Sequence, residues 1–370
     1  MKDLFDMSNE LGPFKIIHIY EPVTGLKAIL VIDNVAVGPS IGGIRIAPDV
    51  TVLEAVRLAR AMTLKNAAAG LRHGGGKAVI NADPRISTEE KERLIRAFAC
   101  SIRNETAYIP GPDMGTDEQC MAWVHDEIQR AVGLPREIGG IPLDEIGATG
   151  YGLYHAVDVA LEYSDIVLQG ARLVVQGFGS VGIHAARNLV AKGAVLVGAA
   201  DSSGSLYHAD GLDLDELVSL KSKGGGLGDS SQGQKLDRDA VIDMECEIWI
   251  PAARPDVIHK DNVHRLKAKL VAQGANIPFT EEAEEILHQR GILVVPDFIA
   301  NAGGVICAAV EYHGGTETVA LQTIAEKIRD NSKRVLEQSV RSRIMPRKVA
   351  LNLAQTRLKA AMKNRRWSLF

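Results

Sequence analysis

The sequence predicts an α/β protein of two domains, the second of which contains a doubly wound parallel sheet. A chain of 370 residues with 46% hydrophobic content is long enough to bury two cores. From Thr149 to Val295, short apolar strands alternate with helices, and this alternation is typical of such a sheet. Within that region, a glycine-rich turn directly follows an apolar strand.

The first domain is predicted to begin with a β-hairpin. Two segments rich in Ile and Val, Phe14–Glu21 and Leu26–Asn34, are separated by the turn signal Pro22–Gly25. Helices follow, and three pairs of residues with capping-box spacing mark their starts: Thr51 with Glu54, Ser87 with Glu90, and Thr116 with Gln119. The first of these helices is expected to carry Lys65 and to end at Gly70.

Lys77 follows three consecutive glycines, Gly74–Gly76, and precedes the apolar residues Ala78–Ile80. Read alone, the glycines are typical of a surface turn. Read with Lys65 and Asp113, they indicate a stiff backbone that presents Lys77 at the edge of a strand. Asp113 is expected in the loop before a helix. A lysine near other cations has a lowered pKa, so Lys77 is a candidate acid–base group.

The second domain contains the pattern Gly177-Phe178-Gly179-Ser180-Val181-Gly182 between a strand and a helix. This context favours a dinucleotide site, because glycines allow a tight turn and a close approach of the pyrophosphate to the helix N-terminus. Asp201 ends the next strand, where a carboxylate accepts hydrogen bonds from the adenine ribose and repels a 2′-phosphate. NAD is therefore favoured over NADP, although Asp201 also fits a turn before Ser202–Gly204.

Domain boundaries follow from the same patterns. Residues 1–143 are assigned to the first domain, 144–312 to the dinucleotide-binding domain, and the helical residues 313–370 are expected to pack back on the first domain. The Gly/Ser-rich segment Lys221–Gln234 is interpreted as a flexible surface loop without chemistry. Pro346 is a candidate start for the last helix.

Composition excludes several classes of function. Acidic residues near Met1 are unlike a signal peptide, and no apolar stretch is long enough to span a bilayer, so we expect a cytoplasmic protein without a membrane partner. The four cysteines are widely spaced, which favours buried thiols over a disulfide framework or a metal site. A net charge of -4 indicates no nucleic-acid partner, even though the last thirty residues are basic.

Lys65, Lys77 and Asp113 together fit the oxidation of an amine, if the first domain faces the nicotinamide across a cleft. One lysine can hold a carboxylate, the second can activate water, and the aspartate can move protons to and from the amine.

Several ordered motifs resemble the glutamate/leucine/phenylalanine/valine dehydrogenase family across nearly the whole chain. They are Gly38–Arg45, Met62–Ala67, Gly74–Lys77, Pro112–Gly115 and Asn301–Val305. The resemblance implies an NAD-dependent amino acid dehydrogenase that forms a homo-oligomer, hexameric or octameric.

The resemblance also implies roles for individual residues. Lys65 would hold the substrate α-carboxylate, Lys77 would be the catalytic lysine, and Asp113 the proton-transferring acid. Further substrate contacts would come from Ile41, Gly42, Gly111, Asn276, Val305 and Ala308. Cofactor contacts would come from the fingerprint residues Gly177–Gly182, Asp201, Thr149, Ala252, Asn276 and Asn301. No metal is implied.

Two positions bear on the substrate side chain. Where glutamate dehydrogenases have a lysine and a serine that bind the side-chain carboxylate, this chain has Ile41 and Ala308. An unpaired buried carboxylate is costly, so an apolar amino acid of the leucine, valine or phenylalanine type is favoured. Plain core packing is the alternative interpretation of these residues.

Two alternative hypotheses about the function stay open. Residues 272–298 and 345–367 resemble glutamate dehydrogenases more closely, so a glutamate enzyme with an atypical pocket is one alternative, with Arg45 or Arg72 as the replacement cation. A catalytically silent, dehydrogenase-like binding protein is another, although it would be expected to lack Lys77 or Asp113.

Overall fold

The computed structural model describes residues 4–364, and these form two compact units. The first unit comprises the chain up to Leu143, together with Val305–Ala320 and the chain from Leu351 onward. The second comprises Asp144–Gly304 and Leu321–Ala350. The C-terminal helices are thus shared between the two units, whereas the sequence-based division placed all of residues 313–370 with the first.

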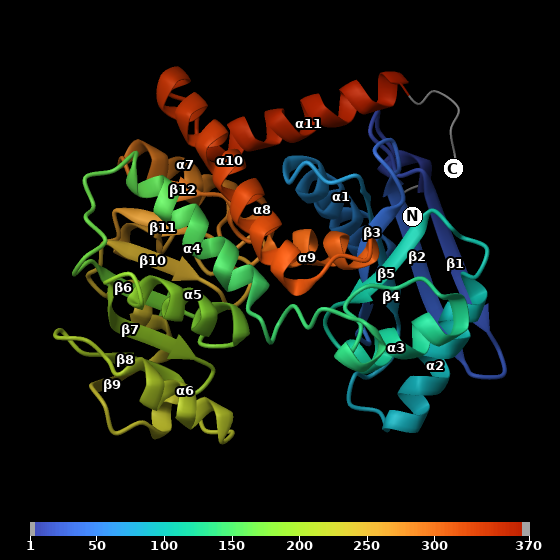
Figure 1. The fold of residues 1–370 in the computed structure, drawn as a ribbon, viewed down its shortest axis with the longest axis horizontal. Helices are drawn as coiled ribbons and strands as arrows, with labels where there is room; N and C mark the ends of the chain where they lie inside the picture. The colour runs from blue at the N-terminus through green and yellow to red at the C-terminus, as the bar shows by residue number, and fades with distance from the viewer. Residues whose placement is uncertain (1–3, 365–370) are drawn as a thin grey trace. The chain divides into compact units, whose positions relative to one another are not determined.

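The first unit is built on a five-stranded sheet (Figure 1). Its order is β1-β2-β4-β3-β5, where β1 pairs antiparallel with β2 and β2 with β4, while β3 is parallel to both β4 and β5. The strands are β1 (Lys15–Glu21), β2 (Leu26–Asn34), β3 (Ser40–Ile46), β4 (Gly74–Ile80) and β5 (Tyr108–Pro112). The predicted hairpin is therefore confirmed as β1 and β2.

Helices cover both faces of this sheet. Helix α1 (Val52–Ala68) packs on one face, where Ala55, Val56 and Ala59 join Val31 and Val79 in a small core. Helices α2 (Thr88–Ser101) and α3 (Glu118–Ile128) cover the other face over a larger core that includes Phe98 and Met121. The sheet therefore presents separate core faces to α1 and to the pair α2 and α3.

Two of the three predicted helix caps are confirmed and one is displaced. Thr51 and Ser87 accept hydrogen bonds from the backbone N–H of Glu54 and Glu90. The third helix is instead capped by Asp117, which accepts from Cys120 N–H. Thr116 does not cap this helix, because its Oγ1 accepts a hydrogen bond from Asp113 N–H and donates one to the Ile44 carbonyl oxygen.

The second unit contains a seven-stranded sheet in the order β12-β11-β10-β6-β7-β8-β9. The strands from β12 to β7 are parallel, and β8 and β9 continue the sheet antiparallel. Their bounds are β6 (Arg172–Gln176), β7 (Val195–Asp201), β8 (Gly204–Tyr207), β9 (Gln234–Leu236), β10 (Ile248–Pro251), β11 (Leu270–Ala272) and β12 (Leu293–Val295). The predicted doubly wound α/β fold is confirmed, with the switch in strand order falling between β6 and β10.

The helices of the second half follow in chain order. They are α4 (Ala148–Leu161), α5 (Ser180–Val190), α6 (Leu214–Ser222), α7 (Glu281–Gln289), α8 (Asp297–Ala300), α9 (Gly303–Tyr312), α10 (Glu317–Ser342) and α11 (Pro346–Asn364). The last helix begins at Pro346 as predicted. Among the described residues, no helix is long and apolar enough to cross a membrane.

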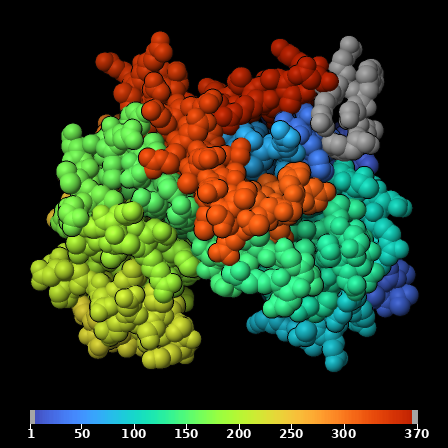
Figure 2. Space-filling model, viewed as in Figure 1, coloured from blue at the N-terminus to red at the C-terminus, as the bar shows by residue number. Residues whose placement is uncertain are grey.

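Two predictions are wrong, one about the structure of residues 221–234 and one about the burial of Cys100. The segment Lys221–Gln234 is not a featureless loop: it contains the end of α6, a 3-10 turn at Leu227–Asp229 with Leu227 fully buried, and the start of β9. In the space-filling view, the yellow part of the chain that includes this segment lies at the surface, next to yellow-green residues that precede it in the sequence (Figure 2). Cys100 is exposed, while the other three cysteines are buried as expected.

Candidate functional site

Lys77 and Asp113 form the centre of a charged cluster on the first sheet. Lys77 lies in the middle of β4, a strand with neighbours on both sides, and not at the strand edge that the sequence suggested. Its side chain is only 6% exposed, and Nζ donates to Asp113 Oδ2 over 2.5 Å. Arg45 Nε donates to the same oxygen over 2.9 Å, and Arg45 Nη1 donates to Glu54 over 2.8 Å.

These contacts set the protonation of the pair. Burial lowers the pKa of Lys77 below its ordinary value, and the positive charge of Arg45 lowers it further, although Asp113 opposes both. For Asp113, burial favours the neutral acid, but Lys77 and Arg45 outweigh it and hold the pKa of the carboxyl below its usual range. Asp113 is therefore ionised at neutral pH, and Lys77 loses its proton more easily than an exposed lysine.

The glycines before Lys77 lie inside β4 because two neighbouring segments approach its backbone closely. A Cβ on Gly75 would lie 2.0 Å from the backbone nitrogen of Thr63 in α1, and one on Gly74 would lie 1.7 Å from the Asn34 carbonyl oxygen. Only glycine leaves room for this packing. The run is thus a helix–strand contact and not a turn.

Helix α1 is fixed to the sheet on both sides of Lys65. Thr63 Oγ1 donates to the buried carboxylate of Asp33 over 2.6 Å, and Arg60 binds both oxygens of that carboxylate. Asn66 Nδ2 donates to the Gly74 carbonyl over 2.6 Å. The half-buried Lys65 is therefore held on the helix that packs directly against the strand of Lys77.

Ile41 lies on the same face of the sheet as Lys77. Side chains alternate along a strand, so Ile44 and Ile46 enter the core under α2 and α3, whereas Ile41 and Arg45 face the opposite side. Ile41 pairs with Gly75 of β4 and is 3% exposed.

The two glycines expected at the substrate allow close packing. A Cβ on Gly42 would lie 1.7 Å from the Gly76 carbonyl oxygen, and one on Gly111 would lie 3.2 Å from Val132 Cγ2.

Val305 and Ala308 lie on α9, where Val305 is half-buried and Ala308 is 6% exposed. Two contacts within the first unit anchor the end of this helix. Glu311 accepts from the backbone N–H groups of Leu134 and Ile141, and the rings of His73 and His313 lie against each other with their Nε2 atoms 3.2 Å apart.

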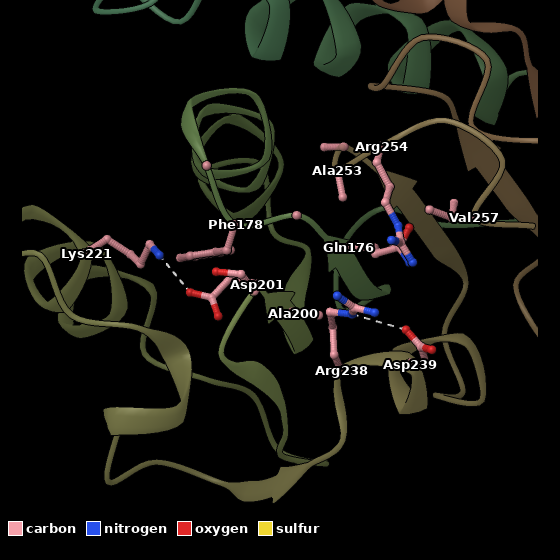
Figure 3. A pocket seen from close by; sticks show the side chains of 14 residues that line it. Gln176, Phe178, Ala200, Asp201, Lys221, Arg238, Asp239, Ala253, Arg254 and Val257 are labelled. Carbon is pink, nitrogen blue, oxygen red and sulfur yellow. Dashed lines mark hydrogen bonds and ion pairs between the residues drawn. The ribbon is translucent and has the colours of Figure 1, made fainter. Parts of the chain in front are cut away.

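A cavity of about 420 Å³ lies at the carboxyl ends of β6, β7 and β10, where the strand order of the second sheet reverses (Figure 3). This is the place where doubly wound sheets bind nucleotides. Among the residues expected to contact the cofactor, five line it: Gly177, Phe178, Gly179, Asp201 and Ala252.

The fingerprint glycines of the second unit have the roles expected for a dinucleotide. Gly177 has a φ of 98°, and a Cβ there would lie 2.6 Å from Ala253 N, so the turn requires glycine. Gly182 allows α5 to pack on β6, with the Gly177 carbonyl oxygen 2.0 Å from its would-be Cβ. Gly179 faces open space and caps α5 without a side-chain hydrogen bond.

A buried amide oxygen also fits a bound cofactor. Gln176 Oε1 lines the cavity and has no hydrogen-bond partner among the described residues. A buried acceptor without a partner is unusual. Together with the open N-terminus of α5, it indicates that the residues present fit a dinucleotide, whose phosphates would lie at Gly179.

Asp201 has more protein partners than expected. Its side chain accepts from Ser203 N–H and Oγ through Oδ1, and from Lys221 Nζ and Leu227 N–H through Oδ2. Figure 3 shows Lys221 and Asp201 paired beside Phe178, with Arg238 and Arg254 also at the cavity. Lys221 thus compensates the charge that would repel a 2′-phosphate.

The remaining expected cofactor residues of the second unit lie outside that cavity lining. Ser180 Oγ donates to the Asp144 carbonyl, Val181 and Gly182 are within α5, and Thr149 is in the first turn of α4. Asn276 and Asn301 are brought together, because Asn301 Nδ2 donates to Asn276 Oδ1 over 2.9 Å. Asn301 Oδ1 is buried and has no hydrogen-bond partner within residues 4–364, so it can accept a further hydrogen bond.

Comparison with known proteins agrees with this geometry. The family profile described as "Glutamate/Leucine/Phenylalanine/Valine dehydrogenase" matches residues 139–366, and that of the "Glu/Leu/Phe/Val dehydrogenase, dimerisation domain" matches residues 16–130. This chain belongs to that family. It is accordingly an amino acid dehydrogenase, and the family implies a nicotinamide dinucleotide cofactor.

Individual relatives carry the name of glutamate dehydrogenase. One from Aeropyrum pernix is 38% identical over 90% of this chain and 85% of its own length. An "NADP-specific glutamate dehydrogenase" from Saccharolobus shibatae is 37% identical over 75% of this chain and 69% of its own. The hetero-hexameric glutamate dehydrogenase of Thermus thermophilus, solved in a Leu-bound form, superposes with a TM-score of 0.87 at 29% identity, covering 97% of this chain and 91% of that one.

Sequence reasoning missed the roles of Arg45 and Lys221. Arg45 was considered only as a replacement cation, yet it binds Asp113 and Glu54. Its position two residues after Gly43, on the face of β3 that carries Ile41, was the available signal. Lys221 lies twenty residues after Asp201 in a segment interpreted as a loop, and no local pattern links the two.

Proposed function

We propose that the protein catalyses reversible NAD-dependent oxidative deamination of an L-amino acid with an apolar side chain to the 2-oxo acid and ammonia. The observation that carries this proposal is the face of β3 and β4, where Ile41 accompanies Lys77 and Asp113. Arg45 already has two carboxylate partners and Arg72 is exposed. A side-chain carboxylate at Ile41 would therefore lack a counter-ion, whereas an apolar side chain needs none.

The charged residues divide the chemistry between them. Lys65 binds the α-carboxylate. Asp113 takes a proton from the α-amino group. A bound nicotinamide would supply the hydride acceptor for Cα, and oxidation there gives the 2-imino acid. Lys77, whose pKa is lowered by burial, takes a proton from the water that attacks the imine carbon and forms a carbinolamine. Asp113 returns its proton to the nitrogen, and ammonia leaves as the hydroxyl proton passes to solvent and the 2-oxo acid forms. Gly42, Gly111, Asn276, Val305 and Ala308 are proposed to complete the substrate contacts.

NAD is the proposed cofactor because Asp201 places a carboxylate where the adenine ribose is expected. Its pKa is held low, since the hydrogen bonds from Lys221 and Ser203 outweigh the effect of burial. The ion pair with Lys221 favours a second candidate, NADP, as a weaker cofactor. Thr149, Ser180, Val181 and Asn301 are proposed to contact the cofactor beyond the cavity.

Glutamate is the second candidate substrate, since the relatives at 37–38% identity carry that name. It requires a cation other than Arg45 at the distal end of the substrate.

We also propose that the first unit binds substrate and forms a homo-oligomer, and that the second binds NAD. The match of residues 16–130 to a dimerisation domain supports self-association.

The proposal is tested by NADH formation at 340 nm with leucine, valine, isoleucine, phenylalanine, tryptophan, alanine and glutamate, each repeated with NADP. Preference for one apolar substrate with NAD is expected. A preference for glutamate would overturn the assignment of substrate, and no turnover with any of them would favour a silent binding protein.

A further inference from the structure

Arg347 joins a buried polar network in the second unit. It lies at the start of α11, and its side chain is only 16% exposed. Nε donates to Glu284 over 2.6 Å, and Nη2 donates to Asp297 Oδ1 and to Gln273 Oε1, each over 2.8 Å. Glu284, Asp297 and Gln273 are 2%, 4% and 0% exposed, so Arg347 is the cation that compensates two buried carboxylates.

The network reaches the loop of Asn276 through Asp297. While Oδ1 of Asp297 binds Arg347, Oδ2 accepts from the backbone N–H of Ile277 over 2.7 Å. Ile277 has a φ of 48°, a left-handed conformation that a β-branched residue rarely adopts. Such a conformation persists only where surrounding contacts hold it, and the bond to Asp297 is one of them.

Asn276 directly precedes Ile277, so the strained backbone sets its direction. On its other side, Asn301 Nδ2 contacts the carbonyl oxygens of Gly274 and Ala275 as well as Asn276 Oδ1. Asp297 and Asn301 lie at the two ends of α8 and hold the two sides of the loop. Asn276 itself is exposed and able to meet a ligand.

We propose that Arg347 is a positioning residue for the nicotinamide end of the cofactor, acting through Asp297 and Ile277 on Asn276. This inference rests on the proposed function only in taking Asn276 as a contact of the nicotinamide. Without Arg347, Asp297 has no cationic partner among the residues that the structure describes, and it loses the geometry that fixes Ile277 N–H. Asn276 then leaves its position, while the cavity at Asp201 and Gly179 is unaffected because none of the four network residues lines it.

The test compares the binding of NAD with that of ADP-ribose, which lacks the nicotinamide, by calorimetry. In Arg347→Met, the Kd for NAD is expected to rise several-fold, the Kd for ADP-ribose to stay within about twofold, and kcat to fall by about tenfold or more, since small displacements of positioned groups cost up to about 100-fold. Glu284→Gln is the matched control, because it removes the other carboxylate of Arg347 but leaves the bonds between Arg347, Asp297 and Ile277.

Asp297→Asn is the second variant, should Arg347→Met fail to fold. It removes one buried negative charge and keeps the side-chain shape, and the same selective loss of NAD affinity is expected. Equal losses for NAD and ADP-ribose, or NAD binding as in the wild type, would overturn the inference. A failure of this inference can be told apart from a failure of the proposed function. If the wild-type protein shows no turnover, its Kd values for NAD and for ADP-ribose can still be measured and compared with those of the variants.

Discussion

Lys77 and Asp113 concentrate the proposed chemistry in one ion pair. A buried lysine is a useful base only if its pKa is low, and its position in the middle of β4 provides the burial. Asp113, which Arg45 also binds, accepts the hydrogen bond from Lys77 Nζ, so the amine is oriented by the protein itself.

Replacing Lys77 with methionine is expected to abolish most of the activity. The substitution keeps an unbranched side chain that is only one atom shorter and leaves Asp113 with its partner Arg45, so the fold should be retained. Because loss of an acid–base group costs about 10²-fold or more, kcat should fall by at least that factor. Steady-state kinetics with a melting curve checks this, and a loss below about tenfold would remove Lys77 from catalysis.

Arg45 is expected to influence the pH dependence of kcat through the pKa of Lys77. Its positive charge lowers the pKa of Lys77, so Arg45→Met should raise that pKa. Activity requires the neutral amine, and the rising limb of kcat against pH should therefore move to higher pH in the variant. A pH–rate profile of both proteins checks the direction. An unchanged or acid-shifted limb would mean that another group controls the profile.

Lys221 is expected to control the choice between NAD and NADP. Lys221→Ala leaves the carboxylate of Asp201 uncompensated, which should increase the preference for NAD in kcat/KM by about tenfold, equivalent to about 1.4 kcal/mol. Lys223→Ala is the control, because Lys223 is exposed and lies outside the cavity lining. If both variants shift the ratio equally, only general surface charge is involved.

At the scale of single elements, β4 and α1 pack together as one structural unit that carries two of the proposed functional residues. The helix carries Lys65, the strand carries Lys77, and the glycines between them remove the side chains that would hold them apart. The contacts of Thr63 with Asp33 and of Asn66 with Gly74 fix the rotation of the helix.

Gly75→Ala should destabilise this part. Its Cβ would lie 2.0 Å from Thr63 N, so backbone must move, and overpacking of this kind costs about 1–3 kcal/mol or more. Gly179→Ala is the control for stability, since a Cβ there meets nothing within 4 Å. Urea unfolding of both variants tests the packing, and equal midpoints would contradict it.

The sequence predicts an element well when residues close to it in the chain determine its structure, and poorly when contacts with distant segments determine it. The hairpin, the caps at Thr51 and Ser87, and the fingerprint turn are local, and they were predicted. The glycines were expected just before a strand edge, with a surface turn as the alternative, and their place inside β4 was not predicted because its cause is the approach of a helix twelve residues upstream. The pairs Lys221–Asp201 and Arg45–Asp113 join distant segments, which one sequence does not reveal.

At the scale of the whole molecule, four basic residues of the described part of the C-terminal helix α11 bind other parts of the chain. Lys348 and Lys359 pair with Glu285 and Glu10, while Arg357 donates to the last carbonyl oxygens of α1 at Ala67 and Ala68. With Arg347 also buried, these cations have partners within the chain.

In the proposed function, the apolar side chain of Ile41, on the same sheet face as Lys77, selects an apolar amino acid. The most direct test is the ratio of kcat/KM for leucine, or for the best apolar substrate, to kcat/KM for glutamate, measured in the wild type and in Ile41→Lys. We expect a wild-type ratio of about 100 or more, the scale of discrimination that arises when a buried charge is left unpaired, and a ratio at least tenfold lower in the variant. A wild type that prefers glutamate, or a ratio that Ile41→Lys leaves unchanged, would contradict it.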